Sequence, residues 1–304
     1  MHEKSEKSMN YKLKSLILTP MNILYAISPK LELQLMFYLK QGYKLRLDAP
    51  QTYNEKINWQ KLYYHNPLFS TCSDKYLVRQ FVRERGCEEI LNDLLWEGFD
   101  PADIPFDKLP DSFVIKVTHG SGFNILCRDK KALDREETVK KLRKWLKTKY
   151  IRCYGECWYG KEKPRVIVEK FLESGDGKPL FDYKFFCYDG EPKYVYVDTW
   201  KDGAHHINMY DVEFHLLKDV SMGYPTDMSD DIKKPACYGQ MLDISRKLSK
   251  DFPHVRVDLY SVQDKPVFGE MTFSKGAGFD KILPYSFDLE MGKDFHVRKY
   301  ENQE

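Results

Sequence analysis

Apolar residues follow a helical spacing in the first part of the chain. Leu31, Leu35 and Tyr38 recur at intervals of three and four residues, which predicts a helix over residues 29–41. Residues 53–64 and 75–85 also fit helices, and the latter has a suitable N-cap in Asp74 and a suitable stop in Gly86. The first hundred residues are therefore predicted to be mainly helical.

Beyond residue 110, short apolar runs and alternating patterns predict strands at 112–118, 123–127, 165–172, 181–188, 192–198, 254–262 and 266–273. Helices are predicted at 134–150, with Asp134 as N-cap, and at 235–251. The prolines within 98–110 indicate a connector. Because the strands come in runs and do not alternate regularly with helices, we predict an α+β fold and not a doubly wound parallel sheet.

The last predicted hairpin places two acids opposite each other. Arg256 and Asp258 share one face of the first strand, and Phe268, Glu270 and Thr272 share one face of the second. A turn over residues 263–265 pairs Asp258 with Glu270, which brings their Cβ atoms to roughly 5 Å. A bound Mg²⁺ would compensate the repulsion between the two carboxylates. A register slipped by one residue, or two solvated acids on an exposed sheet, is the alternative.

Lys116 interrupts an apolar strand, so its side chain either reaches water or meets an anion. The loop that follows it, His119-Gly120-Ser121-Gly122, is small, and its backbone amides can approach a phosphate. This loop matches neither a Walker A loop nor a Rossmann fingerprint. Two further pairs of charged residues stand at strand ends, namely Glu169 with Lys170 and Asp182 with Lys184.

Composition narrows the class of protein. The 304 residues are 42% hydrophobic and 31% charged, as in a soluble globular protein, and a net charge of +2 argues against a dedicated nucleic-acid binder. Seven scattered cysteines form no disulfide framework, so we expect a reducing compartment, the cytoplasm. No apolar stretch is long enough to span a membrane, but the lysines before residue 15 leave open a peripheral contact with its inner face.

The order of the motifs resembles the TupA-like ATP-grasp family of bacterial polysaccharide biosynthesis proteins. The matching stretches, in order, are Tyr53–Trp59, Asp74-Lys75 with Val78-Arg79, Phe113–Gly122, Val168–Leu172, Asp182–Phe186, Val255–Tyr260 and Phe268–Phe279. The resemblance implies an ATP-grasp fold in which two α+β lobes clasp ATP. The lobes would be residues 101–172 and 173–304, after a helical region over residues 1–100.

The resemblance also implies a role for each matching residue. The ATP site would consist of Lys75, Lys116, the loop His119 to Gly122, Glu169, Lys170, Leu172, Asp182, Lys184 and, as a weakly defined candidate, Lys201. Lys75 and Lys116 would contact phosphate, Glu169 and Lys170 adenine, and Asp182 the ribose. The Mg²⁺ ligands would be Asp258, Glu270 and Thr272, with Arg256 and Lys116 as catalytic residues.

Two positions depart from the pattern of this family and its superfamily. Thr272 stands where most ATP-grasp enzymes have Asn, and its hydroxyl can still ligate Mg²⁺. Lys275 stands where this branch often has Pro, which affects the substrate side of the site.

The implied activity is an ATP-dependent carboxylate–amine ligase that works through an acylphosphate. Its expected partners are a uronic acid and an amino acid or amine of a capsule, O-antigen or teichuronopeptide. A glycosyltransferase, a sugar kinase and a non-catalytic carbohydrate-binding protein are the alternatives. The first alternative would use aspartates such as Asp198 and Asp211 for a metal and a sugar nucleotide, and the last would explain the 21 tyrosines.

Overall fold

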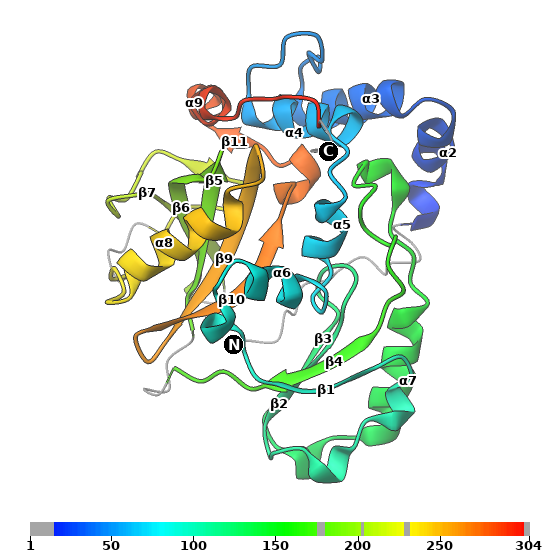
Figure 1. The fold of residues 1–304 in the computed structure, drawn as a ribbon. Coiled ribbons are helices and arrows are strands. Elements are labelled where there is room, and N and C mark those ends of the chain that lie inside the picture. Colours follow the sequence, from blue (N-terminus) through cyan, green and yellow to red (C-terminus); the bar gives the residue numbers. More distant parts are fainter. Residues whose placement is uncertain (1–14, 175–179, 202–203, 228–231, 301–304) are drawn as a thin grey trace.

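The computed structural model describes residues 15–174, 180–201, 204–227 and 232–300, and in it the chain forms two main antiparallel sheets surrounded by helices (Figure 1). The four-stranded sheet has the order β1-β4-β2-β3, and the five-stranded sheet has the order β10-β9-β5-β6-β7. A two-stranded sheet pairs β8 (Ser221–Met222) with β11 (Ile282–Leu283). The predicted α+β class is confirmed.

The four-stranded sheet contains β1 (Leu94–Gly98), β2 (Phe113–Val117), β3 (Asn124–Cys127) and β4 (Val166–Lys170). Helix α7 (Arg135–Leu146) packs on it through the fully buried Leu142, which shares a core with Ile115 and Val166. The predicted cap of this helix is confirmed, since Asp134 Oδ1 accepts a hydrogen bond from the Glu137 amide at 2.9 Å.

The five-stranded sheet contains β5 (Asp182–Tyr188), β6 (Glu191–Lys201), β7 (Ala204–Asp211), β9 (His254–Val262) and β10 (Lys265–Thr272). Helix α8 (Tyr238–Ser249) covers one face, where Val255, Val257 and Leu259 are buried. Helices α4 (Tyr53–Tyr63) and α9 (Tyr285–Asp294) pack on the other face, against Phe186. Strand alternation thus leaves Arg256 and Asp258 on the face opposite α8.

The amino-terminal part is built from α2 (Thr19–Ile27), α3 (Pro29–Gln41), α4, α5 (Leu68–Ser73) and α6 (Val78–Glu84). The predicted helix 29–41 is confirmed, but its apolar stripe Leu31, Leu35 and Tyr38 is exposed. The apolar residues that α3 buries are Leu33, Met36 and Phe37. Both stripes have helical spacing, so periodicity alone cannot tell which one faces the core.

One expectation for the first hundred residues needs correction. Helix α6 begins at Val78 and not at residue 75, because Asp74 Oδ1 accepts the amides of Tyr76 and Leu77 and holds a separate turn there. Gly86, with φ of +65°, follows the helix as predicted. Strand β1 lies before residue 100 and pairs with β4, so this region is not only helical.

The stretch 98–110 contains the short turns η2 (Pro101–Asp103) and η3 (Phe106–Lys108). Strand β7, like β1, was not predicted. The other short helical turns are η1 (Glu88–Ile90), η4 (Lys130–Ala132), η5 (Arg152–Tyr154) and η6 (Lys275–Gly278).

Within the described ranges, no helix combines the length and the apolar character that crossing a membrane requires.

Candidate active site

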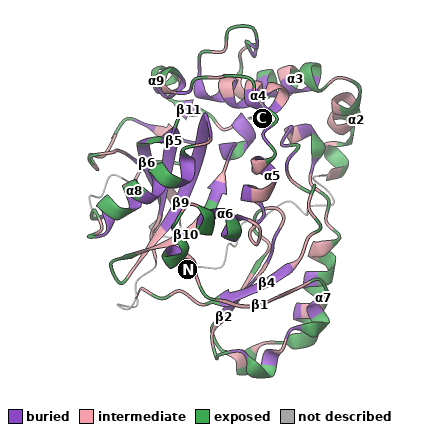
Figure 2. Cartoon of the chain, viewed as in Figure 1, coloured by how far each residue is buried: buried purple, intermediate pink, exposed green. Residues whose placement is uncertain are grey.

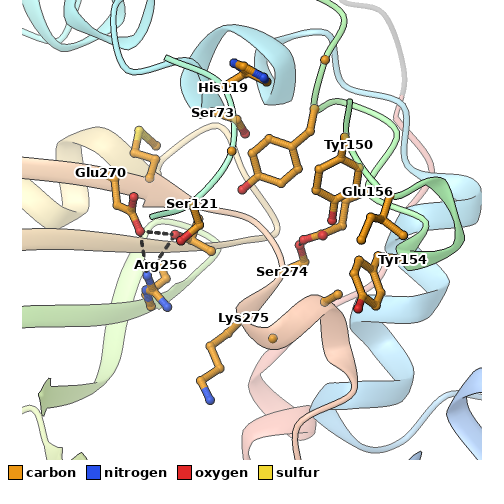
Figure 3. A pocket seen from close by; sticks show the side chains of 18 of the residues that line it. Ser73, His119, Ser121, Tyr150, Tyr154, Glu156, Arg256, Glu270, Ser274 and Lys275 are labelled. Carbon is orange, nitrogen blue, oxygen red and sulfur yellow. Dashed lines mark hydrogen bonds and ion pairs between the residues drawn. The ribbon is translucent and has the colours of Figure 1, made fainter. Parts of the chain in front are cut away.

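A cavity of about 660 Å³ is lined by strands β9 and β10 of the five-stranded sheet, by the β2–β3 loop of the four-stranded sheet and by segments outside both sheets (Figure 3). The β2–β3 loop contributes His119, Gly120 and Ser121, and the β9–β10 hairpin contributes Arg256 and Glu270. Lys75 and Thr272 also line it, so seven of the predicted site residues meet at this cavity.

The predicted pairing of the two acids is confirmed, although the hairpin reaches it by a different route. Glu270 lies opposite Asp258, but the turn has only two residues, Gln263 and Asp264, both with positive φ. The predicted three-residue turn is therefore wrong. A β-bulge at Gly269 restores the pairing, because it adds one residue to β10 between Phe268 and Glu270.

The bulge also corrects the predicted position of Phe268. An extra residue reverses the alternation of side chains, so Phe268 points into the core beneath α8 instead of sharing the face of Glu270. The bulge requires glycine, since a Cβ at Gly269 would lie 2.9 Å from the carbonyl oxygen of Asp258.

Arg256 lies between the two acids. Its Nε is 2.7 Å from Asp258 Oδ1 and its Nη2 is 2.6 Å from Asp258 Oδ2, which is a bidentate ion pair. The same Nη2 is 3.2 Å from Glu270 Oε1 and 3.0 Å from Thr272 Oγ1 (Figure 3). The guanidinium thus compensates the repulsion for which the sequence suggested a metal ion.

Lys184 adds a second cation to this cluster. Its Nζ contacts Asp182 and lies 3.2 Å from Asp258 Oδ2 and 3.3 Å from Asp198 Oδ2. Burial and the neighbouring Asp258 raise the pKa of Asp182 to about 7, against the opposing charge of Lys184. Asp182 Oδ1 has no hydrogen-bond partner among the described residues, so an acceptor remains for a ligand.

The charge and the accessibility of the carboxylates in this cluster decide which of them suit Mg²⁺ as ligands. Four carboxylates and two cations leave a formal charge of −2, and the side chain of Glu270 is 49% exposed. Burial raises the pKa of Glu270, but the charges of Arg256, Lys75 and Lys184 lower this pKa overall, so the Glu270 carboxylate stays ionised. Glu270 therefore fits a divalent cation, but Arg256 contacts all three predicted ligands and would have to move for Asp258, which it holds through two hydrogen bonds, to join Glu270 and Thr272.

Two predicted phosphate-binding lysines lie beside the four-stranded sheet or within it. Lys75 Nζ donates to the carbonyl of Gly120 at 2.7 Å, and Lys116 Nζ is 2.6 Å from Glu169 Oε2. Burial, with a further contribution from Lys116, lowers the pKa of Lys75 although Glu270 opposes this. Lys116 and Glu169 do not line the cavity themselves, and Glu169 is also held by Arg79 at 3.3 Å.

The β2–β3 loop curves over the cavity because Gly120 and Gly122 adopt φ of +77° and +79°. His119 Nε2 lies 2.8 Å from the carbonyl of Thr148, which must be the acceptor. Burial lowers the pKa of His119, so its Nδ1 is an acceptor without a partner among the described residues.

Lys170 and Leu172, like Lys116, Gly122, Glu169, Asp182, Lys184 and Asp258, do not line the cavity. Lys170 has an exposed side chain that lies 3.4 Å from Asp93, and Leu172 follows it in a segment outside the strands. Lys201 stands at the end of β6, and its side chain lies outside the described part of the structure. The cavity wall thus gives no support to Lys170 or Lys201 as ligands in this conformation.

The far wall of the cavity was not predicted. The irregular segment after α7 contributes Tyr150, Glu156 and Tyr159. The residues after the β9–β10 hairpin contribute Ser274 and Lys275. Ser274 donates to Glu156, whose pKa burial raises to about 7 against the opposing charge of Lys61. Lys275 Nζ pairs with Asp280 at 2.7 Å. Only the departure at Lys275 had pointed to this wall.

Solved structures of several ligases are similar to the chain. D-alanine–D-alanine ligase from Bacillus anthracis has 17% identity and a TM-score of 0.45, covering 75% of this chain and 69% of that one. N5-carboxyaminoimidazole synthase from Aspergillus clavatus has 13% identity and a TM-score of 0.41, covering 71% and 46%. L-amino acid ligase from Bacillus licheniformis has 15% identity and a TM-score of 0.41, covering 78% and 49%.

This chain therefore spans less than half of the latter two proteins. No curated protein matches it. The family model described as TupA-like ATPgrasp matches residues 55–296, which is most of the chain and includes both main sheets with the β9–β10 hairpin. This match confirms the resemblance that the motifs suggested. The chain belongs to the TupA-like ATP-grasp family.

Proposed function

We propose that the protein is an ATP-dependent carboxylate–amine ligase that works through an acylphosphate. The observation that carries this proposal is the pairing of Asp258 with Glu270 around Arg256, on a cavity whose other wall holds Lys75 and a glycine loop. An acidic wall can hold the metal of a metal–nucleotide complex, and a basic wall with free amides can hold its phosphates.

Within this proposal the nucleotide lies between the two sheets. Lys75, which lines the cavity, and Lys116 would contact its phosphates, and Asp182 Oδ1, which has no hydrogen-bond partner among the described residues, would accept a hydroxyl of its ribose. Glu169, Lys170 and the amide of Leu172 form the adenine end. Mg²⁺, held by Glu270 and Thr272 and by Asp258 once it has released Arg256, supplies charge neutralisation at the phosphates when bound.

The reaction requires two displacements. An oxygen of the substrate carboxylate attacks the γ-phosphorus, the bond from that phosphorus to the β-phosphate oxygen breaks, and ADP leaves. The nitrogen of the amine then attacks the acyl carbon, the amine loses a proton, and inorganic phosphate leaves as the amide forms. Arg256 donates hydrogen bonds to the negative oxygen that develops on the acyl carbon, while the lysines balance the transferred phosphoryl group.

The acceptor end of the cavity is the wall formed by Tyr150, Tyr159, Glu156 and Lys275. Aromatic rings suit the flat faces of a sugar, and a lysine suits a carboxylate. We propose a uronic acid as the carboxylate and an amino acid or other amine as the nucleophile, in the assembly of a cell-surface polysaccharide such as a capsule or O-antigen.

An isotope experiment tests this proposal. ADP release is first measured with a panel of uronates and amines, and the active uronate is then labelled with ¹⁸O in its carboxylate. A ligase that forms an acylphosphate must move one labelled oxygen into inorganic phosphate. Turnover of these substrates without label in phosphate would refute the ligase reaction even if ATP binding survives.

The same experiment separates the alternatives. A sugar kinase would leave a stable phosphorylated product and no amide. A glycosyltransferase would bind UDP- or GDP-sugars in preference to ATP, and a carbohydrate-binding protein would release no ADP. The matched control is Glu191→Gln, an exposed carboxylate of β6 that pairs with Arg246 and does not line the cavity. It should keep full activity, whereas Glu270→Gln should not.

A further inference from the structure

Helices α2 and α3, with the turn of helix before α2, carry an exposed apolar surface that the proposed ligase reaction does not use. We call this surface the outer face; it consists of Leu16, Ile17, Ile23, Ile27, Leu31, Leu35, Tyr38 and Leu39, with exposures from 40% to 76%. These eight residues are two thirds of the large apolar side chains that are exposed within the described ranges. Such a concentration marks a binding surface, whereas single exposed apolar residues do not.

The outer face is not needed to hold the helices in place. Leu33, Met36 and Phe37 anchor α3 from the opposite side, and Leu18 and Met21 pack against the same core. Both helices therefore have one apolar stripe for the core and a second that points away from it. Figure 1 shows α2 and α3 at the edge of the molecule, outside both main sheets, and Figure 2 shows exposed and intermediate residues along them.

The exposed charged side chains between residues 15 and 47 are all positive. Lys30, Lys40 and Lys44 are exposed beside it, whereas the only acid between residues 15 and 47, Glu32, is fully buried. A second copy of the chain docked on this face would bring the same lysines together, which opposes self-association. The combination of an apolar stripe with a positive border complements an anionic lipid surface.

We propose that the outer face docks the protein on an anionic membrane, with α2 and α3 lying in the interface and not crossing it. The apolar side chains enter the boundary between head groups and acyl chains, and the lysines contact the lipid phosphates. Lys40 also lines the cavity, so docking places the cavity beside the head groups. This inference does not depend on the ligase reaction and survives if that reaction is refuted.

Vesicle co-sedimentation of the full-length protein tests the proposal. Vesicles of phosphatidylcholine with phosphatidylglycerol should bind the protein, vesicles of phosphatidylcholine alone should bind it more weakly, and added salt should reduce binding. The double variants Leu31→Glu/Leu35→Glu and Lys30→Glu/Lys44→Glu should each bind anionic vesicles at least about tenfold more weakly. Leu283→Glu, at a leucine that is 54% exposed elsewhere, is the control and should bind as the wild type does.

Circular dichroism and ATP binding establish that each variant is folded. Absence of binding to anionic vesicles by the wild type would overturn the proposal, and so would binding by both double variants that is as strong as that of the wild type. A third outcome is that neither the wild type nor the leucine variant binds vesicles, while the wild type dimerises in the ultracentrifuge and the leucine variant stays monomeric. That outcome would refute membrane docking and assign the outer face to contact between copies of the chain.

Discussion

Asp258 and Glu270 occupy equivalent positions in the hairpin, yet their replacement should have different consequences. Asp258 is 1% exposed and its carboxylate is held by both Arg256 and Lys184, whereas Glu270 is half exposed at the cavity. We therefore expect Asp258→Asn to act mainly on stability, and Glu270→Gln mainly on the dependence of ATP binding on Mg²⁺.

The magnitudes follow from burial. Removing one partner of a buried ion pair leaves the other charge uncompensated and costs about 3–5 kcal/mol. Asp258→Asn removes the carboxylate shared by Arg256 and Lys184, each with only 8% of its side chain exposed, and leaves Glu270 to Arg256 and Asp182 and Asp198 to Lys184, so we expect the lower end of this range. The contact between Arg256 and Glu270 is at the solvent edge, where ion pairs contribute about 0–1 kcal/mol. The two variants should thus differ by at least about 2 kcal/mol in the free energy of unfolding.

Urea unfolding measures this difference through the midpoint and slope of the transition. Calorimetric titration of ATP with and without Mg²⁺ measures the second effect, and Glu191→Gln again serves as the control carboxylate. The reasoning fails if Asp258→Asn is as stable as Glu270→Gln. The metal assignment fails separately if Glu270→Gln keeps the Mg²⁺ dependence of the wild type.

Three further results are expected. Lys116→Met should weaken ATP binding far more than adenosine binding, whereas Lys170→Met should weaken both alike if the exposed side chain turns inward on binding; equal ATP-to-adenosine ratios in calorimetry would refute this placement. Gly269→Ala should cost about 1–3 kcal/mol in urea unfolding, because its Cβ meets the backbone across the bulge, whereas Gly239→Ala, with open space in α8, should gain up to about 1 kcal/mol. Burial lowers the pKa of His254 to about 3, so between pH 3 and 6.5 the unfolded chain binds more protons and stability should rise with pH; this dependence should flatten in His254→Gln, and an unchanged slope would contradict it.

The sequence could predict the acids of the site because strand periodicity is local and simple. A period of two places Arg256 beside Asp258 on one face, and a hairpin needs only its register to bring Glu270 opposite. The predicted register is correct although the predicted turn is one residue too long. The bulge at Gly269, which was not predicted, adds one residue to β10 and compensates for that error. Phe268 lies between the turn and the bulge, where nothing compensates for the extra turn residue. The sequence therefore placed its side chain on the wrong face of the sheet.

Tertiary contacts explain what the sequence could not predict. Strand β1 is five residues long and is fixed mainly by its pairing with β4, which no local pattern encodes. Helix α3 has two apolar stripes, and only the position of the rest of the chain decides which one is buried. Tyr150 and Glu156 lie in a segment without periodicity, so their meeting with Lys275 depends on how the two lobes pack.

The residues that the sequence could predict and those that it could not lie on different sides of the proposed site. The nucleotide side lies largely on strands and a glycine loop, whose geometry is set by neighbours in sequence. The proposed acceptor side lies on irregular segments, whose geometry is set by packing across the cavity. Evolution of a new acceptor would therefore change residues such as Tyr150, Glu156 and Lys275 and leave the hairpin of Asp258 and Glu270 intact. Exchanging the acceptor-side residues should thus change which uronate and amine are used before it changes the affinity for ATP.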